Sequence, residues 1–386
     1  MGAAPESISA WLRKRFIPGW VSRAWQPGLP GFVESVRWGD GAAIPPQSCS
    51  TMVTGRLVHA FSLGHAFGAG PSSLQAARYG IDVLLGRARR SDGGFAHAIA
   101  ADGSIADPNS DLYDLAFILL ALAAYAAASG RRDVLDVADM IGARLDRDPA
   151  GGFREPAPAD GKRLQYPQMH LFEAFQLLAR VAPRRGWEAR ADAIVDLVER
   201  RLIQPEGCLD EWYDGNWQAV DAGGDPQREL GHQFEWAWLL YRHAWTSSEA
   251  RAAAIADRVY AFGKDVIGPT IGPLPNGIDR AKRPREPVRP LWPLTELLHA
   301  ACLAEFARPG GGDAQVAKAA VAAIFAHHLD AESGLWINAL HARDHPADRV
   351  VPSRLLYHIV PALITFAGEH EAALNAPNPL FDRYRS

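Results

Sequence analysis

The chain has 386 residues, 48% of them hydrophobic and 22% charged, which is enough to bury a large core. Its formal net charge of −4, with no basic stripe, excludes nucleic acid as an expected partner. Its three cysteines, Cys49, Cys208 and Cys302, show no paired spacing, which disfavours a disulfide framework or a thiolate metal site.

The N-terminal sequence MGAAPESISAWLRKRF lacks the continuous apolar segment of a signal peptide. The longest apolar run, residues 115–129, is rich in alanine and shorter than the roughly 20 residues that a membrane-spanning helix needs. We therefore expect a cytoplasmic protein with no membrane partner, present as a monomer or a homodimer.

The sequence predicts helices over most of its length, because Ala and Leu recur at three- and four-residue steps. In chain order, the predicted helices cover residues 7–15, 53–69, 73–89, 112–129, 134–147, 167–181, 187–200, 232–246, 247–262, 291–307, 314–328 and 355–370. Strands do not alternate with these helices, so a parallel β-sheet is not expected.

The helices form pairs that repeat about every 60 residues. The segment HLFEAFQLLAR, which starts at His170, matches HQFEWAWLLYR, which starts at His232, at six of eleven positions. Steps of similar length lead back to Tyr113 and Arg56 and forward to Glu296 and His358. Six repeats of this length fit six helical hairpins closed into a ring, an all-α (α/α)6 barrel. No linker interrupts the period, so we predict one domain over residues 1–386.

In such a ring, the first helix of each hairpin lines the inside and the second packs outside. Residues near the starts of the inner helices should then meet in one pocket: Arg56, Tyr113, His170, His232, Trp292 and His358. Long loops at 90–111, 148–166, 204–230 and 268–290 would cover this pocket, and loops of this length are usually functional.

Two histidines of the repeat are each followed by a glutamate on the same helical face, as His170/Glu173 and His232/Glu235. Paired Glu and His residues bind metals in di-iron bundles. Alternatively, neutral histidines transfer protons near physiological pH. No cysteine or HExxH motif accompanies the pairs, so we favour proton transfer without a metal. No phosphate-binding glycine loop is found, so no nucleotide cofactor is expected.

Aromatic residues near these histidines favour a sugar substrate, because aromatic faces suit the C–H face of a pyranose ring. They are Trp212, Tyr213, Trp217, Trp236, Trp238 and Trp292. Trp292 precedes Pro293 at a predicted helix start and is the best pocket residue, whereas Trp236 and Trp238 also fit core packing.

The ordered motifs YPQMHLFEAF, ELGHQFEWAWLL, LWPLTE and LLYHIVPAL resemble the N-acylglucosamine 2-epimerase superfamily over about residues 50–367. This superfamily includes mannose isomerases, sulfoquinovose isomerase and cellobiose 2-epimerase. The resemblance implies an (α/α)6 barrel and chemistry at sugar C1 and C2 without an obligatory metal or nucleotide. The segment GHQFEWAWLL is closer to the mannose isomerase type. We therefore predict an aldose–ketose isomerase, with a sugar 2-epimerase as the alternative.

The resemblance also implies roles for single residues. His232 and His358 would exchange protons with the ring-opened sugar through an enediol, in an order that the sequence leaves open. His170 would hold the sugar and assist ring opening, and Arg56 would stabilise the enediolate. Glu235 would orient His232 or a water. The other implied pocket or support positions are Tyr113, Glu173 and Trp292.

Three positions depart from the family pattern. Tyr166 replaces the Asn that usually lies four residues before the first motif histidine, and Leu294 replaces a Gln. Arg354 stands where a small or amide residue is expected. We count Tyr166 and Arg354 among the predicted substrate contacts, and the family's usual hexose cannot be assumed.

Two other functional classes remain open from the sequence. A non-catalytic sugar-binding barrel would not need the histidines. A glycoside hydrolase would need two carboxylates across the scissile bond, and Asp210, Glu211 and Asp214 instead cluster on one loop.

Overall fold

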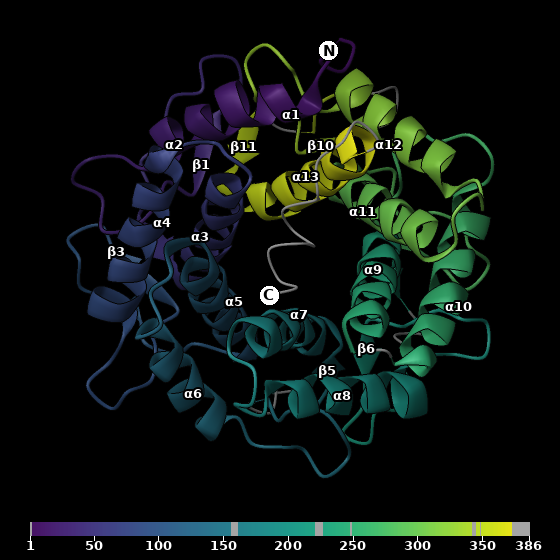
Figure 1. Cartoon of the computed structure of the whole chain (residues 1–386), viewed down its shortest axis with the longest axis horizontal. Coiled ribbons are helices and arrows are strands. Elements are labelled where there is room, and N and C mark those ends of the chain that lie inside the picture. The colour runs from purple at the N-terminus through teal and green to yellow at the C-terminus, as the bar shows by residue number, and fades with distance from the viewer. Residues whose placement is uncertain are drawn as a thin grey trace.

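The computed structural model describes residues 2–155, 161–220, 227–247, 249–341, 345–347 and 349–372, which form two concentric rings of helices (Figure 1). The inner ring consists of α3 (Thr51–Ala66), α5 (Leu112–Ser129), α7 (Tyr166–Val181), α9 (Leu230–Ser247), α11 (Trp292–Ala307) and α13 (Leu356–Ala372). Each inner helix contacts the next, and α13 contacts α3, so the ring is closed. The predicted all-α (α/α)6 barrel is confirmed. The single domain stays a prediction, and its residues 373–386 lie outside the described residues.

Five outer helices each follow an inner helix: α4 (Pro71–Val83), α6 (Val134–Arg144), α8 (Trp187–Leu197), α10 (Ala250–Ile267) and α12 (Asp313–His327). The sixth outer helix comes instead from the N-terminal segment. There α1 (Ile8–Trp11) continues through a π-helical turn (Leu12–Phe16) into α2 (Ile17–Ala24), and α1 packs against α13. The helix predicted at 7–15 is therefore longer, and its inner partner is the last helix of the ring.

Aromatic contacts fix this N-terminal helix in the outer ring. The indole of Trp20 stacks on Trp336 with 4.4 Å between ring centroids, and Trp11 meets Phe325 edge-on at 5.5 Å. The Nε1 of Trp20 also donates a hydrogen bond of 2.8 Å to the Gly334 carbonyl. The two ends of the described chain thus close the ring together.

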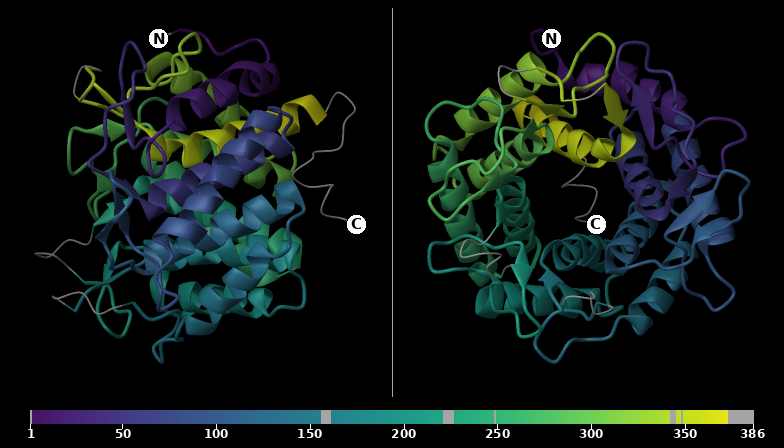
Figure 2. Two further views of the ribbon diagram at one scale, coloured as in Figure 1. Left: turned by 90° about the vertical axis from the view of Figure 1, so that its left-hand side faces the viewer. Right: turned by 180° about the vertical axis from the view of Figure 1, so that it is seen from behind.

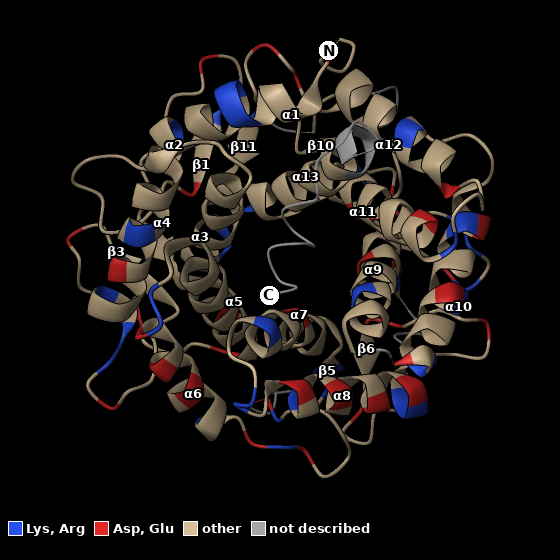
Figure 3. Cartoon of the chain, viewed as in Figure 1, with Lys and Arg blue, Asp and Glu red and all other residues tan. Residues whose placement is uncertain are grey.

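Helix α5 shows why the inner helices are so apolar. It packs against inner helices on both sides and against α6 and α4 outside, so an apolar surface all round suits it. A capping box between Asp111 and Asp114 starts the helix at Leu112, which makes it 18 residues long. By length and composition it is the one helix among the described residues that would pass for a membrane span, yet 72% of that segment is buried. Charged residues gather mainly on the outer helices (Figure 3).

Short antiparallel strands cover one end of the ring. They are β1 (Ser35–Arg37), β2 (Ser48–Ser50), β3 (Ala98–Ala100), β4 (Ile105–Asp107), β5 (Arg163–Leu164), β6 (Trp212–Tyr213), β7 (Arg228–Glu229), β8 (Gly277–Ile278), β9 (Arg289–Pro290), β10 (Ala339–Leu340) and β11 (Val350–Pro352).

The pairing of these strands follows the hairpins. In β2–β3, β5–β6, β7–β8 and β9–β10, the strand before an inner helix pairs with the strand after its outer helix. The pair β11–β1 does the same for α13 and the N-terminal helix, so these two form the sixth hairpin. Seen from the side and from behind, the loops that carry these pairs lie at one end of the ring (Figure 2). The ladders therefore hold the starts of the inner helices at that end.

Candidate active site

A cavity of about 670 Å³ lies where the inner helices begin. Nine of the ten predicted site residues line it: Arg56, Tyr113, Tyr166, His170, His232, Glu235, Trp292, Arg354 and His358. The tenth, Glu173, lines instead a separate cavity of about 80 Å³ inside the ring. The structure thus brings together residues from all six inner repeats, as the period predicts.

His232 lies in the first turn of α9 and is held by carboxylates. Its Nδ1 is 2.9 Å from Glu211 Oε2 and 3.6 Å from Glu229 Oε2. Burial lowers the pKa of His232, but Glu211, Glu229 and Glu235 outweigh burial and raise it to about 9. His232 is therefore an imidazolium at neutral pH. Glu211, from the loop before β6, takes the orienting position that the sequence assigned to Glu235.

His358, in the first turn of α13, has the opposite protonation state to that of His232. Burial, together with the nearby cations Arg56, His232 and Arg354, keeps the pKa of His358 well below its ordinary value. Its Nδ1 lies 2.8 Å from Oε1 of Glu296, a residue that also occupies a repeat position. The other ring nitrogen, Nε2, takes no part in this contact. His358 is therefore a neutral imidazole that can accept a proton.

Trp292 stands beside both histidines. Its ring centroid is 5.0 Å from that of His232 and 5.8 Å from that of His358. The indole Nε1 donates a hydrogen bond of 3.0 Å to Asn276 Oδ1. A Cβ atom on Gly231 would lie 2.0 Å from the indole, so only glycine permits this packing. Trp292 thus provides the aromatic face that the sequence predicts in the pocket.

Arg56, on α3, is a buried cation that also lines the cavity. Its guanidinium donates a hydrogen bond to the Tyr113 hydroxyl, and its Cζ lies 4.4 Å from the Phe117 ring centroid and 4.9 Å from that of Tyr357. Tyr166 packs edge-on against Tyr113, with 5.0 Å between centroids. These contacts fix the guanidinium, which makes it a preorganised donor for a developing oxyanion.

His170 and Glu235 complete the floor of the cavity. Burial, with nearby cations, keeps the pKa of His170 well below its ordinary value, so the ring is neutral. Its Nδ1 lies 3.7 Å from Glu235 Oε1. Burial is the main cause that raises the pKa of Glu235 to about 7. The Oε2 of Glu235 is buried without a hydrogen-bond partner among the described residues.

One group in this cavity has the composition of a metal site. The ligand atoms of Glu235, Glu296 and His358 lie within 4.8 Å of one another. In the structure, however, both oxygens of Glu296 have hydrogen-bond partners: Oε1 lies 2.8 Å from His358 Nδ1, and Oε2 accepts from Trp238 Nε1 at 2.6 Å. In this structure, His358 and Glu296 thus form a hydrogen-bonded imidazole–carboxyl pair. The predicted absence of a metal stays a prediction.

The loop carboxylates that a hydrolase would need are used elsewhere. Asp210 forms a buried ion pair with Arg228 at 2.7 Å, and Glu211 binds His232. Asp214 accepts backbone N–H bonds within its own loop, including 2.8 Å from Asn216. None of the three carboxylates lines the histidine cavity.

The aromatic residues of the same loop were also expected near the sugar. Tyr213 and Trp217 are instead buried in the packing of the loop, where Trp217 Nε1 donates to the Gly151 carbonyl at 2.9 Å. Trp236 and Trp238 are core residues of α9. Of the six aromatics singled out, only Trp292 lines the histidine cavity.

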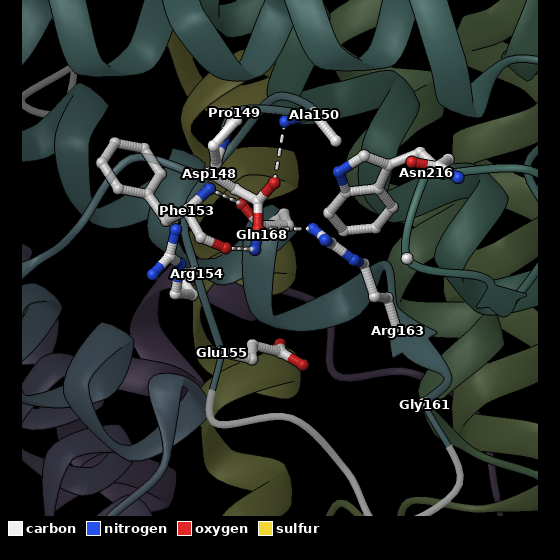
Figure 4. Close-up of a pocket in the computed structure, with 12 residues that line it drawn as sticks. Asp148, Pro149, Ala150, Phe153, Arg154, Glu155, Gly161, Arg163, Gln168 and Asn216 are labelled. Carbon is white, nitrogen blue, oxygen red and sulfur yellow. Dashed lines mark hydrogen bonds and ion pairs between the residues drawn. The ribbon is translucent and has the colours of Figure 1, made fainter.

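A second cavity, of about 770 Å³, lies beside the first turn of α7 (Figure 4). Most of its polar groups are paired: Asp148 binds Arg163 at 2.8 Å, and Gln168 bridges the backbone of Phe153. Glu155 Oε1 is buried without a partner among the described residues, and burial raises the pKa of Glu155 to about 7. No histidine lines this cavity, so we assign the chemistry to the smaller one.

Residues 31–362 match the sequence profile of the N-acylglucosamine 2-epimerase (GlcNAc 2-epimerase) family. The chain belongs to this family. It is 30% identical to a mannose-6-phosphate isomerase of Rhizobium meliloti, over 92% of this chain and 95% of the relative. It is 32% identical to a D-mannose isomerase of Thermobifida fusca, over 52% and 54% of the two chains.

The fold of this GlcNAc 2-epimerase family member also matches solved structures. A cellobiose 2-epimerase from Spirochaeta thermophila superposes with a TM-score of 0.84 at 21% identity, covering 95% of this chain and 96% of that one. The family and its relatives confirm the predicted enzyme class, an isomerase or epimerase acting on carbohydrates.

Proposed function

We propose that the enzyme interconverts an aldose and its ketose, of the mannose–fructose type, through an enediol. The observation that carries this proposal is the pair His232 and His358, which line one cavity in opposite protonation states. An acid and a base poised together are what proton transfer between C2 and C1 requires.

In the proposed reaction, the neutral His358 removes the C2 proton of the open-chain aldose. The C2–H electrons form the C1=C2 bond, and His232 donates a proton to the carbonyl oxygen at C1. Arg56 stabilises the charge that develops on the enediolate oxygens. The hydroxyl at C2 then returns its proton to His232 as its carbonyl forms, and His358 delivers the proton it holds to C1. The orienting carboxylates are Glu211 for His232 and Glu296 for His358.

The substrate is proposed to be a single small sugar, bound without a metal or nucleotide. Trp292 would pack against its ring, and His170, Tyr113, Tyr166, Glu235 and Arg354 would contact its hydroxyls or substituents. We place the enzyme in the reducing cytoplasm, as a monomer or homodimer, in keeping with its three buried cysteines.

Proton NMR of sugars incubated with the enzyme in D2O tests the proposal. D-mannose and its 6-phosphate are the first candidates, because the relatives are named for them. A ketose product is expected, with deuterium at C1 to the extent that the proton held by His358 exchanges with solvent. A 2-epimer labelled at C2 alone would establish the epimerase alternative, and binding with neither a new sugar product nor exchange would establish the sugar-binding alternative. A His232→Ala/His358→Ala double variant controls for uncatalysed exchange.

A further inference from the structure

The hydroxyl of Tyr357 joins three groups behind the proposed catalytic cavity. Tyr357 lies in the first turn of α13 and is 3% exposed. Its O–H donates a hydrogen bond to Glu173 Oε2 on α7. The same oxygen lies 3.3 Å from Glu235 Oε1 on α9 and 3.3 Å from His170 Nδ1 on α7. One phenol therefore connects three inner helices across the ring.

This phenol separates the two internal cavities. His170 and Glu235 line the 670 Å³ cavity, whereas Glu173 lines the 80 Å³ cavity on the other side. Tyr357 itself lines neither of them. Any effect of Tyr357 on a bound sugar must therefore pass through a neighbouring side chain that lines the sugar cavity, and the phenol contacts two of these by hydrogen-bonding groups, His170 and Glu235.

The hydrogen bonds determine where the protons lie. Burial and the adjacent Glu173 and Glu235 carboxyls keep the pKa of Tyr357 well above its ordinary value, so the phenol stays protonated. Its one proton is used in the bond to Glu173, and its oxygen can then only accept. The neutral ring of His170 carries a single proton.

The nitrogen of His170 that faces this arrangement is Nδ1. It faces two oxygens, the phenol oxygen at 3.3 Å and Glu235 Oε1 at 3.7 Å. A proton on Nδ1 can be donated to the phenol oxygen, whose own proton is used by Glu173, whereas a lone pair on Nδ1 would face a lone pair of that oxygen. The other nitrogen of His170, Nε2, has no hydrogen-bond partner among the described residues, and the His170 side chain lines the sugar cavity.

We propose that Tyr357 is a positioning residue that holds His170 as the Nδ1-protonated tautomer, so that Nε2 accepts a hydrogen bond from a sugar hydroxyl. This inference rests on the proposed function, in which His170 assists ring opening. In an oriented histidine, the hydrogen bond made by one ring nitrogen determines which of the two nitrogens carries the proton.

The tautomer can be measured directly without sugar. Long-range ¹⁵N–¹H spectra of histidine-labelled enzyme, with the His170 signals assigned by their loss in His170→Gln, should show a protonated Nδ1 and an unprotonated Nε2. In Tyr357→Phe, both tautomers should appear, and kcat should fall about 10- to 100-fold, as for other residues that orient a ligand or catalytic histidine. KM should change less.

A matched control is Tyr260→Phe. Tyr260 is also buried and donates to a carboxylate, Asp313, at 3.0 Å, but it lies on the outer helix α10. It should keep the wild-type kcat and the His170 spectrum, and thermal melts of both variants report folding.

A wild-type spectrum with the proton on Nε2 would overturn the inference, even if Tyr357→Phe does not fold. So would an unchanged His170 tautomer in a folded Tyr357→Phe. If the wild-type enzyme forms no ketose from any candidate aldose, the proposed function fails, whereas the tautomer measurement stands by itself.

Discussion

His232 and Glu211 are 21 residues apart in the chain, and their side chains meet with 2.9 Å between Nδ1 and Oε2. The β5–β6 and β7–β8 ladders hold the loop of Glu211 beside the start of α9. Among the groups that raise the pKa of His232, Glu211 has the largest effect. This pair therefore sets the charge of the proposed catalytic acid.

Replacing Glu211 by Gln should shift the pH dependence of catalysis. The raised pKa of His232 keeps its acidic form present below about pH 9, and this form is lost as the pH rises through that value. Without the Glu211 carboxylate, the loss should occur at lower pH. Profiles of kcat/KM against pH measure the shift. The control variant Asp214→Asn, in the same loop, should leave the alkaline limb of the kcat/KM profile unchanged. If the alkaline limb does not move in Glu211→Gln, the assignment of His232 as the acid is wrong.

His232→Ala and His358→Ala should each lower kcat by about 10²- to 10⁴-fold, because each removes one proton-transfer group. Sugar affinity should change less, since many hydroxyl and stacking contacts contribute to it. Arg56→Ala should also lower turnover, and it should weaken sugar binding more than either histidine substitution does. Steady-state kinetics and calorimetric titration measure these effects, with His327→Ala on the outer helix α12 as the control. Full activity in either histidine variant would contradict the mechanism.

Gly231→Ala should disturb the pocket through Trp292. The added Cβ would lie 2.0 Å from the indole, which must then move from its place beside both histidines. Overpacking of this kind costs about 1–3 kcal/mol of stability. We expect a lower melting temperature and a raised KM. Gly86→Ala is the matched control, because nothing lies within 4 Å of its Cβ. Equal melting temperatures and KM values for the two variants would show that the close contact has no consequence.

Exhaustive chelation should leave turnover unchanged, because the proposed proton transfer uses His232, His358 and Arg56 and no metal. Activity before and after dialysis against EDTA, with elemental analysis of the protein, provides the measurement. Loss of activity that one divalent cation restores would instead favour a metal held by Glu235, Glu296 and His358.

The fold could be predicted because the same helical hairpin recurs with one period. His170 and His232 occupy matching positions of that repeat, and a closed ring brings matching positions together. The helix at residues 7–15 was predicted, but its place as the sixth outer helix was not, since it precedes the first inner helix in the chain. Its aromatic residues Trp11 and Trp20 find Phe325 and Trp336 only in three dimensions.

The orienting groups were harder to predict, because they do not follow the repeat. Glu211 lies in a loop, and only the strand pairing at the end of the ring brings it to His232. Tyr357 directly precedes His358, but its partners Glu173 and Glu235 belong to other helices. The sequence period already included Glu296, and the hydrogen bond between Glu296 and His358 explains why a carboxyl group lies at that repeat position.

The sixth hairpin also has a consequence for synthesis on the ribosome. Residues 8–24 are made well before their inner partner α13, which begins at Leu356. The aromatic face of the N-terminal helix therefore stays uncovered until the segments that it packs against have been made. Such long-range closure is slow and exposes apolar surface to aggregation. A nascent chain of this enzyme thus offers chaperones a binding segment that disappears only when the last hairpin is complete.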